Sequence, residues 1–447
     1  MLSASGLLGY GFPEDSLKLG MQRDLHMVGV DGGSSDPGPH YLGSGKCVNS
    51  RMAMKRDMAL LLKAAMTHRI PMIIGSCGGA GGEPHLQTCV DILREIAREE
   101  GFHFKLAVIH SEQKKDWLKG KLAAGKVHPL GAAGPLQTDT IDRAERIVGM
   151  MGPEPYLEAL GQGAQIILAG RSTDPAPWAA LAMHRGLPPA PSWYAGKMLE
   201  CGTGAAVPKG HDCQLAAVGT DYVDMEPASP ARRCTPLSVA IQALHENASP
   251  TIHKEPGGML DTTDCRIEAV SDRTVRISGM RWTPQPYTIK LEGAELAGYS
   301  AMTIAGARDP GLIGRMDEFL KTVREAVAFK TGGFGVRADD YRLVFRRYGR
   351  DGVMGEWEPE HDATPHEVGL VVEAIADNQE IANAVIAIAR VTLLHTDFPG
   401  RLCKEGNMAF PFSPSDIERG AVYQFSLRHV VEPDDPLSMF PIEYESI

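Results

Sequence analysis

The first two hundred residues alternate between short apolar runs and longer stretches in which apolar side chains recur every three or four positions. Short apolar runs bounded by glycine predict buried strands, and the longer periodicity predicts amphipathic helices. The predicted strands lie at 25–30, 70–76, 104–110 and 164–171, and the predicted helices at 49–69, 84–101, 111–125 and 139–150. This alternation favours βαβ units and predicts an α/β fold with a mostly parallel, doubly wound sheet.

The hydrophobic pattern changes near residue 205. Between 206 and 335, short strand-like stretches with frequent Pro and Gly predict a β-rich continuation that ends in an amphipathic helix at 315–332. After 336 the order strand, strand, helix, strand predicts a small C-terminal α+β module of the ferredoxin-like or swivel kind. We therefore expect an α/β domain over 1–335, with its parallel part at 1–205, and a module over 336–447.

Composition narrows the class of protein. The formal net charge of the 447 residues is −11, and because no stretch is basic, nucleic acid is not expected as a partner. No apolar run reaches the ~18 residues that a membrane helix needs, and the first residues do not resemble a signal peptide. The eight cysteines never occur as C-x-x-C, which is typical of a reducing compartment. We expect a cytoplasmic homo-oligomer that does not bind a membrane.

Polar residues follow the predicted parallel strands. Ligands bind beyond the carboxyl ends of strands in such sheets, so these residues are candidates for chemistry. The first strand is followed by Asp36 and His40, and the second by a glycine-rich loop at 75–82 and then by Glu83 and His85. Each carboxylate and imidazole pair is a candidate general acid and base, or half of a metal site.

The loop at 75–82 carries five glycines and leads into a predicted helix. Open backbone N–H groups at a helix N-terminus favour a carboxylate or a phosphate, whereas a tight loop that only lets the helix pack closely is the alternative. Neither G-x-G-x-x-G nor G-K-[S/T] fits the loop, so there is no NAD or ATP signature. The candidate substrate-binding residues here are Ser76, Gly78, Gly79 and Gly81.

Cys77 lies in the same loop, close to the start of the predicted helix. A helix N-terminus lowers the pKa of a thiol, so Cys77 is a candidate nucleophile, and simple core filling is its alternative. Arg171 follows the fourth predicted strand and is a candidate anchor for a substrate carboxylate, with a salt bridge to Asp174 as the alternative. Asp174, together with Glu200 and His253 from later element ends, is predicted to line a shared substrate cleft.

Six motifs, in this order, resemble the acyclic terpene utilisation AtuA family. They are "LLGYGFPEDSL", "VGVDGGSSDPGPHYLGSG", "IIGSCGGAGGEPHL", "LAGRSTDPAPWAALAMHRG", "MLECGTGA" and "KEPGGMLDTTD". The opening "LLGYGFPED" replaces the "GSGAGFSGDR"-type opening of the terpene-degrading branch, so the chain resembles a different branch. The resemblance implies a catabolic context that involves branched or dicarboxylic acids or their CoA thioesters, and it supplies no catalytic residues.

We expect an enzyme that acts on a small branched, di- or tricarboxylic acid, or its CoA thioester, as a hydratase, a dehydratase-type lyase or an isomerase. The glycine loop and Arg171 would hold the acid, and one of Asp36, His40, Glu83 and His85 would remove a proton while another protonates the leaving group. Two alternatives stay open: a metal-assisted hydrolase or lyase with a divalent metal, and a non-catalytic ligand-binding or scaffold subunit with a small partner protein. The sequence identifies neither a cofactor nor metal ligands.

Overall fold

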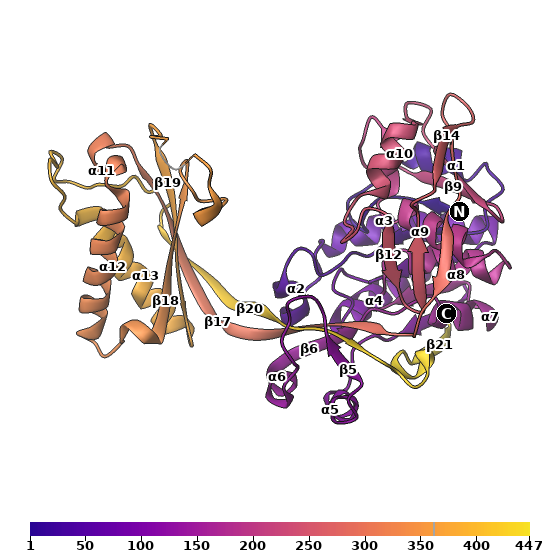
Figure 1. The fold of residues 1–447 in the computed structure, drawn as a ribbon, viewed down its shortest axis with the longest axis horizontal. Coiled ribbons are helices and arrows are strands. Elements are labelled where there is room, and N and C mark those ends of the chain that lie inside the picture. Colours follow the sequence, from indigo (N-terminus) through magenta and orange to yellow (C-terminus); the bar gives the residue numbers. More distant parts are fainter. Residues whose placement is uncertain (361–362) are drawn as a thin grey trace. The chain divides into compact units, whose positions relative to one another are not determined.

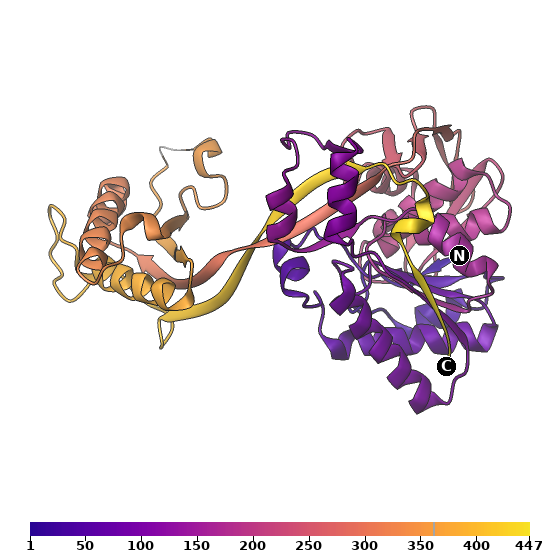
Figure 2. The same ribbon diagram turned by 90° about the horizontal axis from the view of Figure 1, so that it is seen from below.

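The computed structural model describes residues 1–360 and 363–447, which form two compact units. Unit 1 comprises Met1–Glu295 and Phe425–Ile447, and unit 2 comprises Leu296–Gln424. The chain leaves unit 1 along strand β17 (Ile289–Ala307) and returns along β20 (Asp416–Val431), which is hydrogen-bonded to β17 (Figure 1, Figure 2). The division predicted after residue 335 falls inside unit 2, because the change of unit occurs within one continuous strand.

Unit 1 is built on a mixed sheet whose ten described strands run in the order β14-β15-β10-β9-β1-β2-β3-β7-β4-β21. The consecutive parallel strands are β1 (Leu2–Ser3), β2 (Val28–Asp31), β3 (Met72–Gly75), β7 (Ile166–Ala169) and β4 (Lys105–Ile109). The antiparallel strands are β9 (Gln214–Val218), β10 (Tyr222–Pro227), β15 (Val275–Ser278), β14 (Arg266–Ala269) and β21 (Ile442–Ser446). The predicted α/β class with a parallel sheet segment is confirmed.

Most residues of the parallel strands are apolar because both faces of the sheet are buried there. On β3, Met72 and Ile74 belong to one core cluster, while Ile73 between them belongs to the other. Helices α3 (Arg51–His68) and α4 (Glu83–Glu100) supply side chains to the cluster of Met72. Helices α7 (Glu154–Gly161), α8 (Ala176–His184) and α9 (Pro189–Leu199) supply side chains to the cluster of Ile73. The loops that follow the carboxyl ends of these strands are therefore attached to a well-packed sheet.

The helix predicted over 139–150 is wrong in its second half. Helix α6 covers only Thr138–Arg143, and Ala144–Gly149 forms strand β6, which pairs with β17. The segment "AERIVG" is only six residues long and contains β-branched residues, so it can pair with a strand that is distant in sequence. This tertiary pairing outweighs the local helix propensity.

The remaining elements of unit 1 are short. The helices are α1 (Glu14–Gly20), α2 (Pro39–Ser44), α5 (Lys115–Ala123) and α10 (Pro236–Ala243). The strands are β5 (Val127–Pro129), β8 (Ala206–Val207), β11 (Arg233–Cys234), β12 (Ile252–Glu255), β13 (Gly258–Asp261) and β16 (Arg281–Pro284). Strands β12, β13 and β16 form a small sheet, and Trp282 on β16 stacks on Trp193 of α9 with ring centroids 5.6 Å apart. This contact fixes the small sheet, and with it Glu255, against α9.

Unit 2 contains the end of β17, helices α11 (Pro310–Gly314) and α12 (Met316–Gly332), strands β18 (Tyr341–Tyr348) and β19 (Val368–Ala376), helix α13 (Gln379–His395) and the start of β20. Its strands lie in the order β18-β19-β17-β20. Helices α12 and α13 lie side by side against the sheet (Figure 1). Apolar side chains of the helices and the sheet, such as Phe319 on α12 and Leu370 on β19, form a separate core cluster. In the described residues, none of the helices has the length and apolar character needed to cross a membrane.

Candidate functional site

The carboxyl ends of three neighbouring parallel strands bring polar side chains together. Strand β2 ends at Asp31, β3 is followed directly by Ser76, and β7 is followed by Gly170 and Arg171. Because the strands are parallel neighbours, their ends meet at one edge of the sheet, as predicted for ligand sites in this class of fold.

Arg171 makes most of the polar contacts at this edge, with only 3% of its side chain exposed. Its Nε donates to Glu292 Oε2 at 3.0 Å, and its Nη1 donates to Asp174 Oδ1 at 3.0 Å and to Ser76 Oγ at 3.1 Å. Burial by itself would lower the pKa of Arg171, but the two carboxylates outweigh it and raise that pKa. The salt bridge to Asp174, which the sequence left open as an alternative, is present.

Three further carboxyl groups interact with Asp174, namely Asp31, Glu200 and Glu255, and the four together are here called the acid cluster. Burial is the main reason why their pKa values are raised, and the charge of Asp174 raises the pKa of the other three further. The pKa of Glu200 and that of Glu255 are each raised to about 8. At neutral pH, these two groups therefore hold protons that they can donate.

The pKa of Glu292 on β17 is shifted in the opposite direction, although only 7% of its side chain is exposed. Burial works against ionisation, but Arg171 and Lys290 outweigh it and lower the pKa of Glu292 to about 2. Lys290 Nζ lies 2.9 Å from Glu292 Oε1, and the hydroxyl of Ser35 donates to Glu292 Oε2 at 2.9 Å. The edge thus combines a charged carboxylate, Glu292, with two carboxyl groups, Glu200 and Glu255, whose pKa values of about 8 keep them protonated at neutral pH. This is the contrast found between acid and base pairs in active sites.

A cavity of about 480 Å³ opens at Glu292. Both charged or polar residues and apolar residues line it. The charged and polar residues are Ser35, Asp36, Lys290, Glu292 and Arg428, and the apolar side chains, here called the apolar wall, are Leu130, Phe425 and Leu427. The volume lies within the range of about 300–1,000 Å³ that small-molecule sites occupy.

Asp36 connects this cavity to the acid cluster. It is exposed, lines the cavity, and its charge contributes to the raised pKa of Asp174. Asp174 is 24% exposed, so it is accessible from the solvent side of the cluster. A carboxylate that lines the cavity and a buried carboxyl group beside it are therefore candidates for a proton acceptor and a proton donor.

Lys197 and His253 lie beside Glu200 at the other side of the acid cluster. Lys197 Nζ is 2.7 Å from Glu200 Oε1, and both side chains are at least 90% buried. His253 is buried, and burial together with the nearby charge of Lys197 lowers its pKa to about 4. At neutral pH His253 is therefore a neutral imidazole.

The glycine-rich loop is packed against the chain itself. Gly78, Gly79 and Gly81 all have positive φ, and a Cβ at these positions would meet Cys47, Val48 and Arg171, respectively, at 2.7 Å or less. The carboxylate of Glu112 accepts the backbone N–H of Glu83 at the start of α4, at 2.9 Å. The alternative of a tight loop that permits close packing therefore accounts for these glycines, and the anion at the N-terminus of α4 is a side chain of the protein.

The other candidates make their contacts elsewhere. Glu83 Oε2 lies 2.8 Å from His110 Nδ1, and this hydrogen bond raises the pKa of His110. His85 is buried, with its Nε2 3.0 Å from the carbonyl of Tyr41, and burial lowers its pKa.

Two further candidates lie apart from the residues that line the cavity. The thiol of Cys77 is buried in the core cluster, 3.7 Å from the carbonyl oxygen of Ile74. His40 lies on α2, edge-on to Tyr41, with ring centroids 5.5 Å apart.

The structure therefore brings together Asp36, Ser76, Arg171, Asp174, Glu200 and His253 from the sequence-predicted set. The charged residues of this region outside the predicted set are Asp31, Lys197, Glu255, Lys290, Glu292 and Arg428. A signal for Glu292 exists, because a charge within the strand-like run "YTIKLEGAEL" falls on the same face as Lys290, two positions earlier. Among the described residues, no group of three or more His, Cys, Asp or Glu side chains is arranged to hold a metal ion.

The fold and this site define an α/β protein with a buried carboxyl cluster at the carboxyl edge of its parallel strands and a cavity lined by charged residues beside it. The model of the family described as "Acyclic terpene utilisation family protein AtuA" matches residues 51–409. The match covers most of the chain, so the chain belongs to the AtuA family, as its motifs predicted. No curated protein and no solved structure matches it.

Proposed function

We propose that the chain is an enzyme that acts on a small carboxylic acid, or on the acyl group of its thioester, by general acid and base chemistry. The observation that carries the proposal is the cavity of about 480 Å³ at which Asp36 adjoins the acid cluster. The chemistry best supported is that of a hydro-lyase or an isomerase, because both reactions need one group that removes a proton from carbon and one that delivers a proton.

Arg428 and Lys290 are the groups that would bind the substrate carboxylate. Arg428 is exposed at the cavity and forms no ion pair within the described part of the chain, and Lys290 is 46% exposed. The apolar wall of Leu130, Phe425 and Leu427 would contact the hydrocarbon part of the acid. The substrate class is therefore a small acid with a carboxylate that binds the two cations and an apolar branch that contacts the three apolar side chains.

Asp36 would act as the base, and Asp174 as the acid that it adjoins. Burial raises the pKa of Asp174, which favours the protonated form that an acid needs, and Asp36 is exposed at the cavity, where it can reach the substrate. Glu200 and Glu255 would supply the replacement proton from behind Asp174, since each has a pKa of about 8. Arg171 would act as a positioning residue that holds Asp174 and Glu292 in place.

A ligand screen by thermal unfolding tests the substrate class. We expect one or more short branched, di- or tricarboxylic acids or acyl-CoA thioesters to stabilise the protein, by about 2.7 kcal/mol at one hundred times the dissociation constant. Arg428→Gln and Lys290→Gln should each abolish most of this effect, whereas Lys209→Gln, an exposed lysine of unit 1, should preserve it. Equal stabilisation of the wild type and Arg428→Gln would contradict the assigned orientation of the substrate.

A further inference from the structure

A second cavity, of about 610 Å³, lies within unit 2 between α12 and the edge strand β18. On α12, the residues that line it are Asp317, Leu320, Lys321 and Arg324, whose spacing places them on one face of the helix. The rest of the wall is Phe345, Arg346 and Arg347 on β18 and the turn at 351–355. Three consecutive residues of one strand line the cavity because the open edge of β18 borders it.

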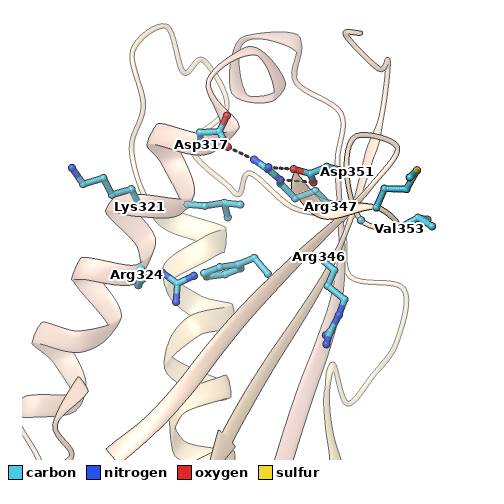
Figure 3. A pocket seen from close by; sticks show the side chains of 12 residues that line it. Asp317, Lys321, Arg324, Arg346, Arg347, Asp351 and Val353 are labelled. Carbon is cyan, nitrogen blue, oxygen red and sulfur yellow. Dashed lines mark hydrogen bonds and ion pairs between the residues drawn. The ribbon is translucent and has the colours of Figure 1, made fainter. Parts of the chain in front are cut away.

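The charges around this cavity are mainly positive. Four arginines occur between 342 and 350 in a chain whose net charge is −11. Arg347 forms ion pairs with Asp317 and Asp351 (Figure 3). In addition, Arg350 Nη2 lies 3.1 Å from Asp317 Oδ2. Both acidic side chains that line the cavity are therefore already paired with arginines.

Lys321 and Arg324 are left without an ion pair among the described residues. Arg324, on α12 beside the cavity (Figure 3), is nevertheless held in place. Its guanidinium carbon lies 5.0 Å from the centroid of the Phe345 ring, and its Nη1 donates to the carbonyl of Leu343 at 2.6 Å. A guanidinium has five N–H donors, so most of its hydrogen-bonding capacity is available to a ligand. Because its position is already fixed, binding an anion costs little side-chain entropy.

Apolar groups lie next to these cations. Leu320 and Phe345 form part of the wall, and Val353 and Met354 on the turn are 84% and 50% exposed. Trp357, two residues beyond the turn, is 84% exposed. Cations beside exposed apolar side chains match a ligand that carries an anionic group and a flat apolar part.

We propose that this cavity binds a small phosphate ester of the nucleotide class. Lys321 and Arg324 bind the phosphate oxygens, and the apolar turn with Trp357 contacts the ring system. The proposal uses residues of unit 2 alone and is independent of the function proposed for unit 1, so either can fail without the other.

Titration of the full chain with ADP, followed by calorimetry and by tryptophan fluorescence, tests the proposal. We expect saturable binding that weakens as salt is added, and at least tenfold weaker binding to the double variant Lys321→Ala with Arg324→Gln. Lys321→Ala alone removes an exposed side chain without an ion pair and should weaken binding at least threefold, which keeps the test valid if the double variant folds poorly.

The matched control is the double variant Lys404→Ala with Arg342→Gln. It removes the same charges from exposed positions of unit 2 outside the cavity, and it should bind ADP within twofold of the wild type. Pyrophosphate should bind at least tenfold more weakly than ADP, and adenosine should bind more weakly still. The proposal is overturned if the wild type does not bind ADP at millimolar concentration, if Lys321→Ala binds as the wild type does, or if pyrophosphate or adenosine equals ADP.

Discussion

At the scale of single residues, the stability of the site depends on the pairing of each buried charge with a group of opposite charge. Arg171 is held by Glu292 and Asp174, and Glu292 is held by Arg171 and Lys290. Removing one partner of a buried ion pair leaves the other charge without compensation, and this costs more than the pair contributes while intact.

Glu292→Gln should therefore destabilise unit 1. We expect the free energy of unfolding, measured with urea at pH 7.5, to fall by about 3 kcal/mol. Glu145→Gln changes an exposed glutamate of unit 1 that forms no ion pair within the described residues, and it should stay within about 0.5 kcal/mol of the wild type. A loss below 1 kcal/mol for Glu292→Gln would show that Arg171 does not depend on this carboxylate.

Glu255 gives the acid cluster a defined pH dependence. Its pKa is about 8 in the folded protein and about 4.3 in an unfolded chain, so between these values only the folded state keeps the proton. Stability contributed by this proton is present at low pH and is lost as pH rises through the window. Gln has no proton to lose, so Glu255→Gln should gain stability relative to the wild type between pH 5 and pH 8, by about 1–3 kcal/mol.

Unfolding free energies at several pH values measure this difference. Glu268→Gln, at an exposed position of β14, is the control and should differ from the wild type by the same amount at every pH. A flat difference for Glu255→Gln as well would mean that Glu255 has an ordinary carboxyl pKa.

At the scale of elements, the close approach of two loops determines the shape of the site. Gly81 has φ +67°, and a Cβ there would lie 2.2 Å from the backbone nitrogen of Arg171. Gly125 has nearly the same φ, +69°, but has nothing within 4 Å of such a Cβ. Comparing substitutions at these two glycines therefore separates the cost of placing a side chain on a left-handed backbone from the cost of a steric clash.

Gly125→Ala should lower the unfolding free energy by about 1–2 kcal/mol, the cost of a left-handed conformation for a residue with a Cβ. Gly81→Ala should cost about 2 kcal/mol more, because it also pushes the loop of Arg171 away from the loop of Gly81. Thermal and urea unfolding of both variants provide the measurement. Equal losses would mean that the two loops can move apart freely.

The elements themselves could largely be predicted from the sequence. The helices predicted at 49–69, 84–101 and 315–332 are confirmed as α3, α4 and α12, because each has a sustained apolar period. Strand β6 could not be predicted, since its pairing partner β17 lies more than a hundred residues away. Lys290 and Glu292 were missed for the same reason: their place beside Arg171 depends on where β17 runs, which no local pattern indicates.

At the scale of the whole molecule, the chain passes between its two compact units within continuous strands. A domain boundary is usually marked by a Pro- or Gly-rich linker. Here the chain passes from unit 1 to unit 2 between Glu295 and Leu296, inside the continuous strand β17. It returns at Phe425 inside β20, so the last residues belong to the first unit. Arg428 reaches the cavity of unit 1 in this way.

The central claim is that this cavity performs proton transfer on a bound carboxylic acid. Incubation in D₂O with the acids and thioesters that stabilise the protein, followed by mass spectrometry, tests it most directly. The account predicts that the wild type introduces deuterium at a carbon of one such ligand or converts it, and that Asp36→Asn and Asp174→Asn do so at least a hundredfold more slowly. Asp221→Asn, an exposed aspartate without an ion pair in the described part of unit 1, should match the wild type. Ligands that bind without exchange or conversion, or undiminished exchange by Asp174→Asn, would contradict the account.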